Sequence, residues 1–227
     1  MRTTFLFCVV FLAVLCSLAT ARHAAFLKCY IDTPIGGYTP VAEQTAKCFE
    51  ENYVDTVSVL SLHLCGELGL NELALRNAEH VIVEGCTSTF LIGGGLVLPE
   101  ELASLNFNGV DFIGSRTQRE SIFTPANTDT SLSFEMCSFS GFVNVTVIDL
   151  TASEFDIAVS FKRVFFWSNT NTSFVFHNVG SFIATGMVIR NNEPGFNITL
   201  NPISDGPLVF KNANIVTDET TNTTTFY

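Results

Sequence analysis

The side chains that could carry out acid–base or metal chemistry form one local group in the second half of the chain. Its members are Asp149, Glu154, Asp156, Lys162 and Arg163. Clustered carboxylates can bind Ca²⁺ and a neighbouring basic residue can abstract a proton, and a lyase needs both. Charged residues at this spacing are also typical of solvated turns, and we therefore assign no catalytic residue here.

A second candidate region is the stretch 114–131, the most polar part of the chain before its C-terminal end. It contains Arg116, Arg119 and Asp129. Loops that project from a rigid scaffold commonly hold ligands. This stretch is therefore our candidate ligand loop, and an ordinary solvated loop is the alternative.

Other catalytic and cofactor motifs are missing from the sequence. The histidines are scattered and no Cys-x-x-Cys pair occurs, so zinc is not expected. The glycines of 92–95 are not followed by Lys-Ser or Lys-Thr, which indicates a turn rather than a nucleotide loop. No Gly-x-Ser-x-Gly nucleophile elbow is present. We expect neither a cofactor nor a metal ion.

An internal repeat organises the elements that must position these residues. Each copy has apolar residues at positions i, i+2, i+5 and i+7. The copies are Leu105-x-Phe107-x-x-Val110-x-Phe112, Leu132-x-Phe134-x-x-Cys137-x-Phe139, Val159-x-Phe161-x-x-Val164-x-Phe166, Phe182-x-Ala184-x-x-Met187-x-Ile189 and Leu208-x-Phe210-x-x-Ala213-x-Ile215. Their starts are 27, 27, 23 and 26 residues apart. A period of this length is typical of solenoids and propellers.

The spacing within one copy describes two strands joined at a corner. Residues two apart lie on one side of a strand, and the three-residue step would reverse that side unless the chain bends there. Residues at the step include Asn108-Gly109 and Thr185-Gly186, which tolerate the positive φ of a sharp corner. A propeller blade would need about 40 residues. The sequence therefore predicts an all-β fold, a parallel β-helix whose repeated apolar residues point inward.

Two earlier stretches, 54–64 and 73–83, predict less regular coils. In the second stretch the signature can start at Leu73, and Val81 is an alternative inward residue. Counted from Leu73, the step to Leu105 is 32 residues, which exceeds the period and predicts an extra loop in this coil.

The region from about residue 57 to 216 resembles the right-handed parallel β-helix of the pectin-lyase-like superfamily, whose coils carry a similar line of aliphatic and aromatic residues. The resemblance implies a right-handed helix and raises the possibility that the chain cleaves an acidic polysaccharide. Asn127-Thr128-Asp129 looks like the first acidic motif of polygalacturonases. The Asp-Asp, Gly-His-Gly and Arg-x-Lys motifs of that family do not occur here.

A second likeness is to repetitive β-helix surface proteins, including polymorphic membrane proteins. Phe166-Trp167-Ser168-Asn169 is similar to their Phe-x-x-Asn signature, and Gly93-Gly94-Gly95-Leu96 approximates their Gly-Gly-Ala-aliphatic signature. Those proteins add a membrane-anchoring barrel that is not expected here. This likeness implies a surface or adhesive role.

The first 21 residues predict a secretory signal. Arg2 precedes an apolar run over 5–16, and Ala19-Thr20-Ala21 fits a cleavage site. The run is too short to span a bilayer, and no later segment is apolar enough. Cleavage removes one of 11 basic residues and none of 22 acidic ones, so the formal charge becomes −12. We expect an extracellular protein with no transmembrane anchor and no nucleic-acid partner.

The remaining chain is predicted to be one elongated domain with an N-terminal cap (22–53), a β-helix (54–216) and a polar tail (217–227). Thr39 and Pro40 fit the first positions of a helix in the cap. The expected buried stripe of this helix consists of Val41, Thr45, Cys48 and Phe49. A short helix across the first coil would cover its exposed end.

Five cysteines remain after cleavage, so one must be unpaired. Cys137 occupies the inward slot that valines hold in neighbouring copies, and we expect it to be free and buried. The other four allow three pairings. Cys65 and Cys86 are 21 residues apart, which is near one period and favours a bridge between adjacent coils. Cys29–Cys48 would then join the cap to its own lead-in.

Four glycosylation sequons are present, at Asn144, Asn171, Asn197 and Asn222. The first three lie 11 or 12 residues from a coil start, and all four are expected in the variable half of the coil. This placement predicts that the sequons share one side of the rod and that contacts use the opposite side. Chance placement is the alternative, because Asn and Thr are common in turns.

These observations predict a secreted, glycosylated β-helix that acts as a binding, adhesive or structural module, with extracellular glycans or surface proteins as partners. The alternative is a divergent polysaccharide lyase or glycoside hydrolase of the pectin-lyase-like type. Three acidic side chains that converge on one outer face would favour the enzyme.

Overall fold

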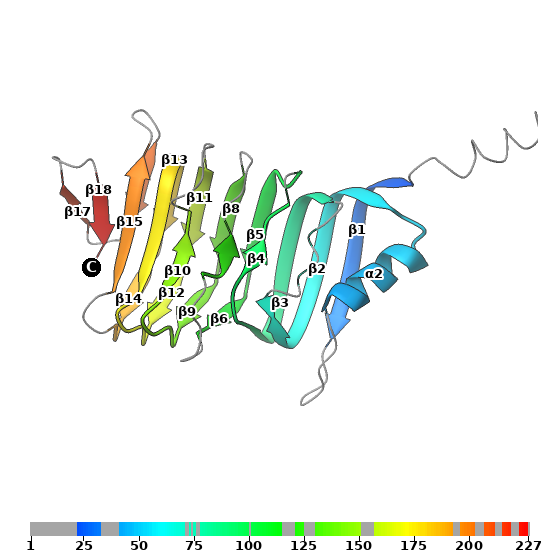
Figure 1. Cartoon of the computed structure of the whole chain (residues 1–227), viewed down its shortest axis with the longest axis horizontal. Coiled ribbons are helices and arrows are strands. Elements are labelled where there is room, and N and C mark those ends of the chain that lie inside the picture. The colour runs from blue at the N-terminus through cyan, green and yellow to red at the C-terminus, as the bar shows by residue number, and fades with distance from the viewer. Residues whose placement is uncertain are drawn as a thin grey trace, which may run out of the picture.

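The computed structural model describes residues 22–32, 41–70, 73, 75, 78–99, 101–114, 121–124, 130–150, 157–192, 196–202, 207–211, 215–218 and 223–226. Most of them belong to strands, and one short helix lies near the N-terminal end (Figure 1). The strands wind into a parallel β-solenoid of about five turns. The predicted parallel β-helix is therefore confirmed.

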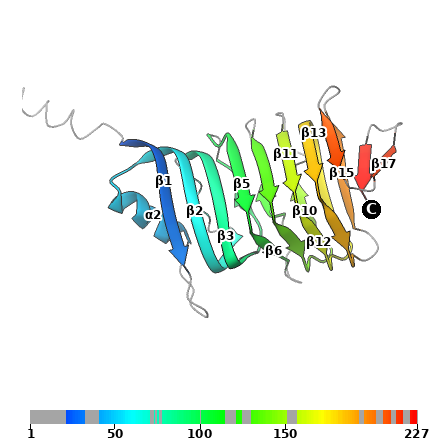
Figure 2. The ribbon, with the colours of Figure 1, turned by 180° about the vertical axis from the view of Figure 1, so that it is seen from behind.

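Each full turn has three strands, which form three ladders along the rod that we call faces 1, 2 and 3. Face 1 contains β1 (His23–Asp32), β2 (Thr56–Gly69), β3 (Ala78–Ile92), β5 (Ser104–Asn108), β8 (Ser131–Glu135), β11 (Ile157–Lys162), the second half of β13 (Ser173–Thr185) and β16 (Leu208–Lys211). Figure 2 shows these strands side by side.

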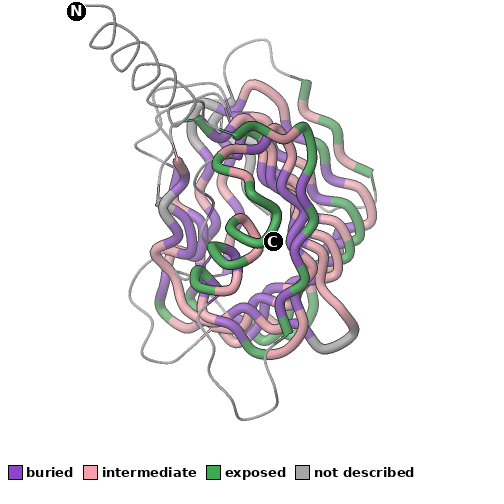
Figure 3. The backbone as a smooth tube through the Cα atoms, turned by 90° about the vertical axis from the view of Figure 1, so that its right-hand side faces the viewer, coloured by how far each residue is buried: buried purple, intermediate pink, exposed green. Residues whose placement is uncertain are grey.

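Faces 2 and 3 are made of shorter strands. Face 2 contains the ends of β2 and β3, then β6 (Asp111–Ile113), β9 (Ser138–Ser140), β12 (Phe165–Trp167) and β14 (Val188–Arg190). Face 3 contains β4 (Leu96–Val97), β7 (Phe123–Thr124), β10 (Thr146–Asp149), the first half of β13 and β15 (Asn197–Pro202). A view along the rod shows the coils lying over one another (Figure 3).

The register of face 1 is the one that the repeat predicts. Leu105 pairs with Leu132, which in turn pairs with Val159. The phenylalanines two residues later pair in the same way, and all are buried: Phe107, Phe134 and Phe161. The rings of Phe107 and Phe134 stack with centroids 5.6 Å apart. The inward direction of these residues is confirmed.

A bend lies at the three-residue step between faces 1 and 2. The residue at the bend has positive φ in four successive coils: Gly109 (67°), Met136 (51°), Arg163 (56°) and Gly186 (67°). A positive φ turns the chain sharply, so both strands can present apolar residues to the same core. The predicted corner is therefore present, and two coils form it without glycine.

The early coils differ from the prediction in one respect. Val81, not Leu73, occupies the position that Leu105 has in the next coil, because Val81 pairs with Leu60 on one side and Leu105 on the other. Counted from Val81, the step to Leu105 is 24 residues, close to the period. The extra loop predicted from a 32-residue step is therefore wrong. The error arose because Leu73 imitates the signature five residues before β3 begins.

The N-terminal region adds a strand that the sequence did not reveal. β1 pairs in parallel with β2, and α2 (Val41–Glu51) packs against β1. Within α2, Val41 and Thr45 are buried. Cys48 and Phe49 are partly buried against the core, so the predicted stripe faces inward. Thr39 and Pro40 lie outside the described residues.

Both predicted cysteine pairs lie at disulfide distance. The Cα atoms of Cys29 and Cys48 are 5.9 Å apart, and those of Cys65 and Cys86 are 5.3 Å apart. Cys137 is unpaired and buried, as expected. Burial raises the pKa of its thiol to about 12, although backbone hydrogen bonds oppose that shift.

The C-terminal stretch that was expected to be a polar tail also contributes strands. β17 (Ile215–Asp218) and β18 (Thr223–Phe226) pair antiparallel, and β18 pairs antiparallel with β15 of face 3. Within the described part of the chain, no helix has the length and apolarity to cross a membrane. The predicted signal, 1–21, lies outside the described residues.

Candidate binding groove on face 2

Three consecutive aromatic residues form β12, and the strand sends them to opposite sides. Phe166 points into the core and is fully buried. Phe165 and Trp167 point outward and remain 47% and 48% exposed. The two outward rings lie on the same strand, so they form an exposed aromatic pair on the outer side of face 2.

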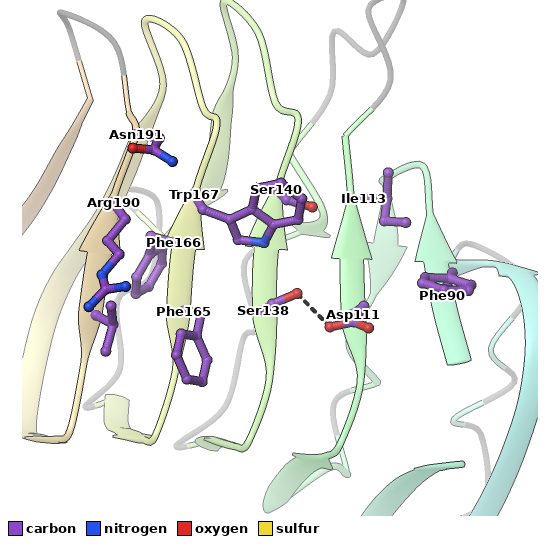
Figure 4. Close-up of a pocket in the computed structure, with 11 residues that line it drawn as sticks. Phe90, Asp111, Ile113, Ser138, Ser140, Phe165, Phe166, Trp167, Arg190 and Asn191 are labelled. Carbon is purple, nitrogen blue, oxygen red and sulfur yellow. Dashed lines mark hydrogen bonds between the residues drawn. The ribbon is translucent and has the colours of Figure 1, made fainter. Parts of the chain in front are cut away.

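A shallow groove of about 460 Å³ lies beside these rings on the outer side of face 2 (Figure 4). Its lining comes from four neighbouring coils and the end of β3. The lining residues are Phe90, Asp111, Ile113, Ser138, Ser140, Phe165, Phe166, Trp167, Val188, Arg190 and Asn191. We call this surface the groove.

Two small residues on β9 create the hollow. Ser138 pairs with Asp111 on one side and Phe165 on the other, while Ser140 pairs with Ile113 and Trp167. Adjacent strands lie about 4.8 Å apart, so the walls on β6 and β12 stand about 10 Å apart across the serines. The serines therefore form the floor, and larger side chains of the neighbouring coils form the walls.

The groove contains hydrogen-bonding groups as well as aromatic rings. The hydroxyl of Ser138 donates to Oδ1 of Asp111 at 2.5 Å, which fixes the carboxylate toward the floor. Among the described residues, no ion-pair partner faces Arg190. A ligand in the groove can therefore contact exposed aromatic rings, two hydroxyls, a carboxylate and a guanidinium.

Stacked rings support the groove from inside. Phe112, Phe139 and Phe166 follow one another on β6, β9 and β12, and their rings are nearly parallel. Their centroids are 4.7 and 5.3 Å apart. A close-packed inner row of this kind resists movement of the strands, so the outer residues are held in a fixed arrangement.

A pair of asparagines fixes the corner that follows β12. Asn169 is fully buried, accepts a hydrogen bond from the backbone N–H of Phe142 and donates one to the carbonyl of Phe139. Asn192 repeats the arrangement in the next coil, because it accepts from the N–H of Asn169 and donates to the carbonyl of Phe166. The Phe-x-x-Asn signature therefore has a structural role at this corner.

The sequence-predicted ligand loop starts beside the groove. Gly114 directly follows Ile113, and a Cβ atom at Gly114 would lie 2.5 Å from the Cα of Phe142. A side chain at this position would collide with the neighbouring coil, so glycine is needed there. Arg116, Arg119 and Asp129 lie outside the described residues.

The predicted acid–base group is divided between different faces. Asp149 lies on β10 of face 3, whereas Lys162 and Arg163 lie at the corner between faces 1 and 2. Lys162 forms an ion pair with Glu135 of the adjacent coil. The other two members, Glu154 and Asp156, lie outside the described residues. In the described ranges, no three His, Cys, Asp or Glu side chains form a group that could hold a metal ion.

Two sequon asparagines lie on adjacent coils at the corner between faces 2 and 3. Asn144 and Asn171 are exposed, and the side-chain amide of Asn171 donates to Oδ1 of Asn144 at 2.8 Å. Asn197 starts β15 opposite Ser173, two positions further along the coil. Its Oδ1 is buried without a partner. Asn222 lies outside the described residues.

Comparison with known proteins found no match among family models, curated proteins or solved structures. The groove itself was not predicted from the sequence. A signal for it is the run Phe165-Phe166-Trp167, because a strand can bury only one side of three consecutive aromatic residues.

Proposed function

We propose that this chain is a secreted, glycosylated binding or adhesive module that holds an extracellular saccharide in the groove. The observation that carries the proposal is the outward pair Phe165 and Trp167 beside a floor of serines. The apolar C–H side of a sugar ring can stack on an indole, and its hydroxyls need hydrogen-bonding groups at the ring edge. Ser140 supplies such a group next to Trp167, and Ser138 and Asp111 supply others in the row of Phe165.

The charge of the protein favours a neutral saccharide. The chain carries a formal charge of −11, and Asp111 adds a carboxylate within the groove itself. A polyanionic chain would be repelled by this field, even though Arg190 offers one local cation.

The alternative function, a divergent polysaccharide lyase or glycoside hydrolase, needs a second catalytic group. Glycosidases use a pair of carboxyl groups that flank the scissile bond. In the described lining of the groove, Asp111 is the single carboxylate. The groove therefore favours binding over cleavage.

The proposal also covers the N-terminal end of the solenoid and the handedness of its winding. The helix α2 lies beside the first coil in Figure 1, and Val41 and Thr45 are buried there. We infer that α2 caps the apolar end of the solenoid and keeps it from associating with other chains. The right-handed winding expected for parallel crossovers is part of the same proposal.

A glycan array combined with a reducing-end release assay tests the function. The secreted protein should bind one class of neutral saccharides and release no reducing ends. Trp167→Ala should weaken that binding about tenfold or more, because the indole ring on which the sugar stacks is lost. Phe26→Ala removes an aromatic ring that is 56% exposed on face 1 and serves as the matched control. Release of reducing ends, or binding that Trp167→Ala leaves unchanged, contradicts the proposal.

A further inference from the structure

The outer side of face 1 has a flat centre made of small residues. In three successive coils these residues are Ser104 and Asn106, then Ser131 and Ser133, then Ala158 and Ser160. They stand in register on neighbouring strands, so they form rows along the rod. Figure 2 shows the strands of face 1 that carry them. None of them is long enough to stand out from the sheet, and this part of face 1 is therefore level.

Apolar residues lie at both ends of the middle row. Ile82 precedes Asn106 on one side, while Ile183 and Val209 follow Ser160 on the other. Ile183 and Val209 are among the large apolar side chains that the chain exposes. Ile82, at the other end, is half-buried. Apolar side chains that flank a level polar centre are typical of a contact surface.

The row of face 1 nearest face 2 carries charges in a particular order. Glu84 and Glu135 occupy its first half, and Lys162 and Lys211 occupy its second half. One end of the row therefore carries carboxylates and the other carries ammonium groups. Glu84 also lies 3.6 Å from Nζ of Lys28 within the same chain, at the edge of the row. Lys211 has no ion-pair partner within the part of the chain that the structure describes.

We propose that two copies of this chain associate through the outer sides of face 1, with their rods antiparallel. The two-fold axis would run parallel to the strands and pass between β8 and β11. Such an axis lays each row against the same row of the second copy in reverse order. The acidic half of one row then faces the basic half of the other.

This axis makes the whole row self-complementary. Glu135 faces Lys162 of the second copy, and Glu84 faces Lys211 of the second copy, so each contact occurs twice. In the middle row, Ser133 faces Ser160 at the centre and Ile82 faces Val209 at the ends. A partner of different sequence would need to reproduce this order of charges, and a second copy has it already.

The positions of the sequons leave face 1 accessible. In a rod with three faces, the corner between faces 2 and 3 lies opposite face 1. Asn144 and Asn171 are both at that corner. Sugars attached there would point away from the proposed contact.

The proposed contact surface is small for a stable dimer. From β3 to β16 the strands cover about 24 Å, and each strand contributes about 15 Å of width. Two such surfaces bury roughly 800 Å² in total, which is below the range of stable complexes. We therefore expect a reversible dimer with a dissociation constant in the micromolar range, weakened by salt.

Sedimentation velocity on the purified secreted chain over the micromolar range, at low ionic strength, tests the dimer. The wild type should shift from monomer to dimer with concentration. Ser133→Arg should abolish the shift, because the new side chain separates the level centres. Thr199→Arg, on the outer side of face 3, is the matched control and should leave dimerisation unchanged.

A charge exchange tests the antiparallel arrangement itself. Lys211→Glu and Glu84→Lys should each weaken self-association about tenfold, because like charges then face one another. An equimolar mixture of the two variants should recover it, since every acidic residue again faces a basic one. Circular dichroism melts check that both variants are folded. A wild type that stays monomeric, a dimer that Ser133→Arg leaves intact, or a mixture that fails to recover overturns the proposal.

Discussion

The inner and outer sides of face 2 carry the same residue type in different roles. Phe165 and Phe166 are the same residue type and are neighbours in sequence. Phe166 is buried between Phe139 and Phe174, with ring centroids 5.3 and 5.0 Å away. Phe165 stands outside on the same strand beside Ser138. The alternation of the strand, rather than the residue type, therefore decides whether an aromatic side chain of β12 packs in the core or lies on the surface.

The two sides also differ in how strictly each coil repeats the last. On the inside, β6, β9 and β12 carry Phe112, Phe139 and Phe166, an unbroken row of one residue type. On the outside, the partners in register are Asp111, Ser138 and Phe165. The inner row must fill the same space in every coil, whereas the outer row has no such restriction.

The largest effect expected from this comparison concerns the inner ring. Phe166→Ala should lower the free energy of unfolding by about 3–5 kcal/mol, because the stacked core cannot close the cavity. Phe165→Ala should lower it by less than about 1 kcal/mol, since an exposed ring leaves no cavity. Urea unfolding of both variants measures the difference. Equal losses would contradict the assignment of the two sides.

Asn169 and Asn171, at the corner after β12, give the same comparison of a buried and an exposed residue of one type. Asn169→Ala should cost about 2–3 kcal/mol, because it leaves a buried N–H and a buried carbonyl without partners. Asn171→Ala removes one exposed hydrogen bond, to Asn144, and places Ala at a φ of 45°, so it should cost about 1 kcal/mol. Thermal unfolding of the two variants gives the ranking, and a reversed order would contradict the buried role of Asn169.

A pH effect is expected from the buried thiol. The pKa of Cys137 is raised to about 12, mainly by burial, whereas the thiol of an unfolded chain ionises near 8.5. Above pH 8.5 the unfolded state loses this proton and the native state keeps it, so stability falls as pH rises, by up to about 1.4 kcal/mol per pH unit.

Cys137→Val isolates this effect from other groups that titrate at high pH. Valine already fills the same slot at Val110 and Val164, where it is fully buried. The variant should match the wild type below pH 8 and should lose less stability between pH 8 and 10. Parallel curves for both proteins would show that the thiol ionises in the native state.

The smallest effect concerns the sequons at the corner. Two glycans at Asn144 and Asn171 would be attached on adjacent coils, about 5 Å apart. We expect molecules with both sites occupied to be rarer than the separate occupancies predict, and Asn171→Gln to raise occupancy at Asn144. Glycopeptide analysis of protein secreted from eukaryotic cells measures both. Full occupancy of both sites would show that the corner accommodates two glycans.

The sequence predicts the local features of the fold well and the groove poorly. The step at Asn108-Gly109 and the alternation of Phe107 with Leu105 are local patterns, so the corner and the register follow directly from them. The groove depends on Trp167 standing beside Ser140, a residue 27 positions earlier. That neighbourhood becomes visible only once the coils are stacked in register.

The N-terminal region shows a second limit of the sequence. β1 was not foreseen, because it lacks the three-residue step and is joined to β2 through a helix rather than a short loop. Its inward residues Leu27, Cys29 and Ile31 are separated by exposed ones, an alternation that is visible only over a few residues. A single short alternation cannot be distinguished from chance without its partner strand.

The fluorescence of Trp167 tests most directly whether the groove holds a saccharide. The chain contains one tryptophan, so its emission reports on the groove alone. Titration with the saccharide that binds on the array should change the intensity or the wavelength of emission in a saturable way, because a sugar ring would cover an indole that is 48% exposed. Ser140→Arg, which fills the floor, should abolish the change. Saturable binding of the saccharide with constant Trp167 emission would contradict the claim that the groove holds the ligand.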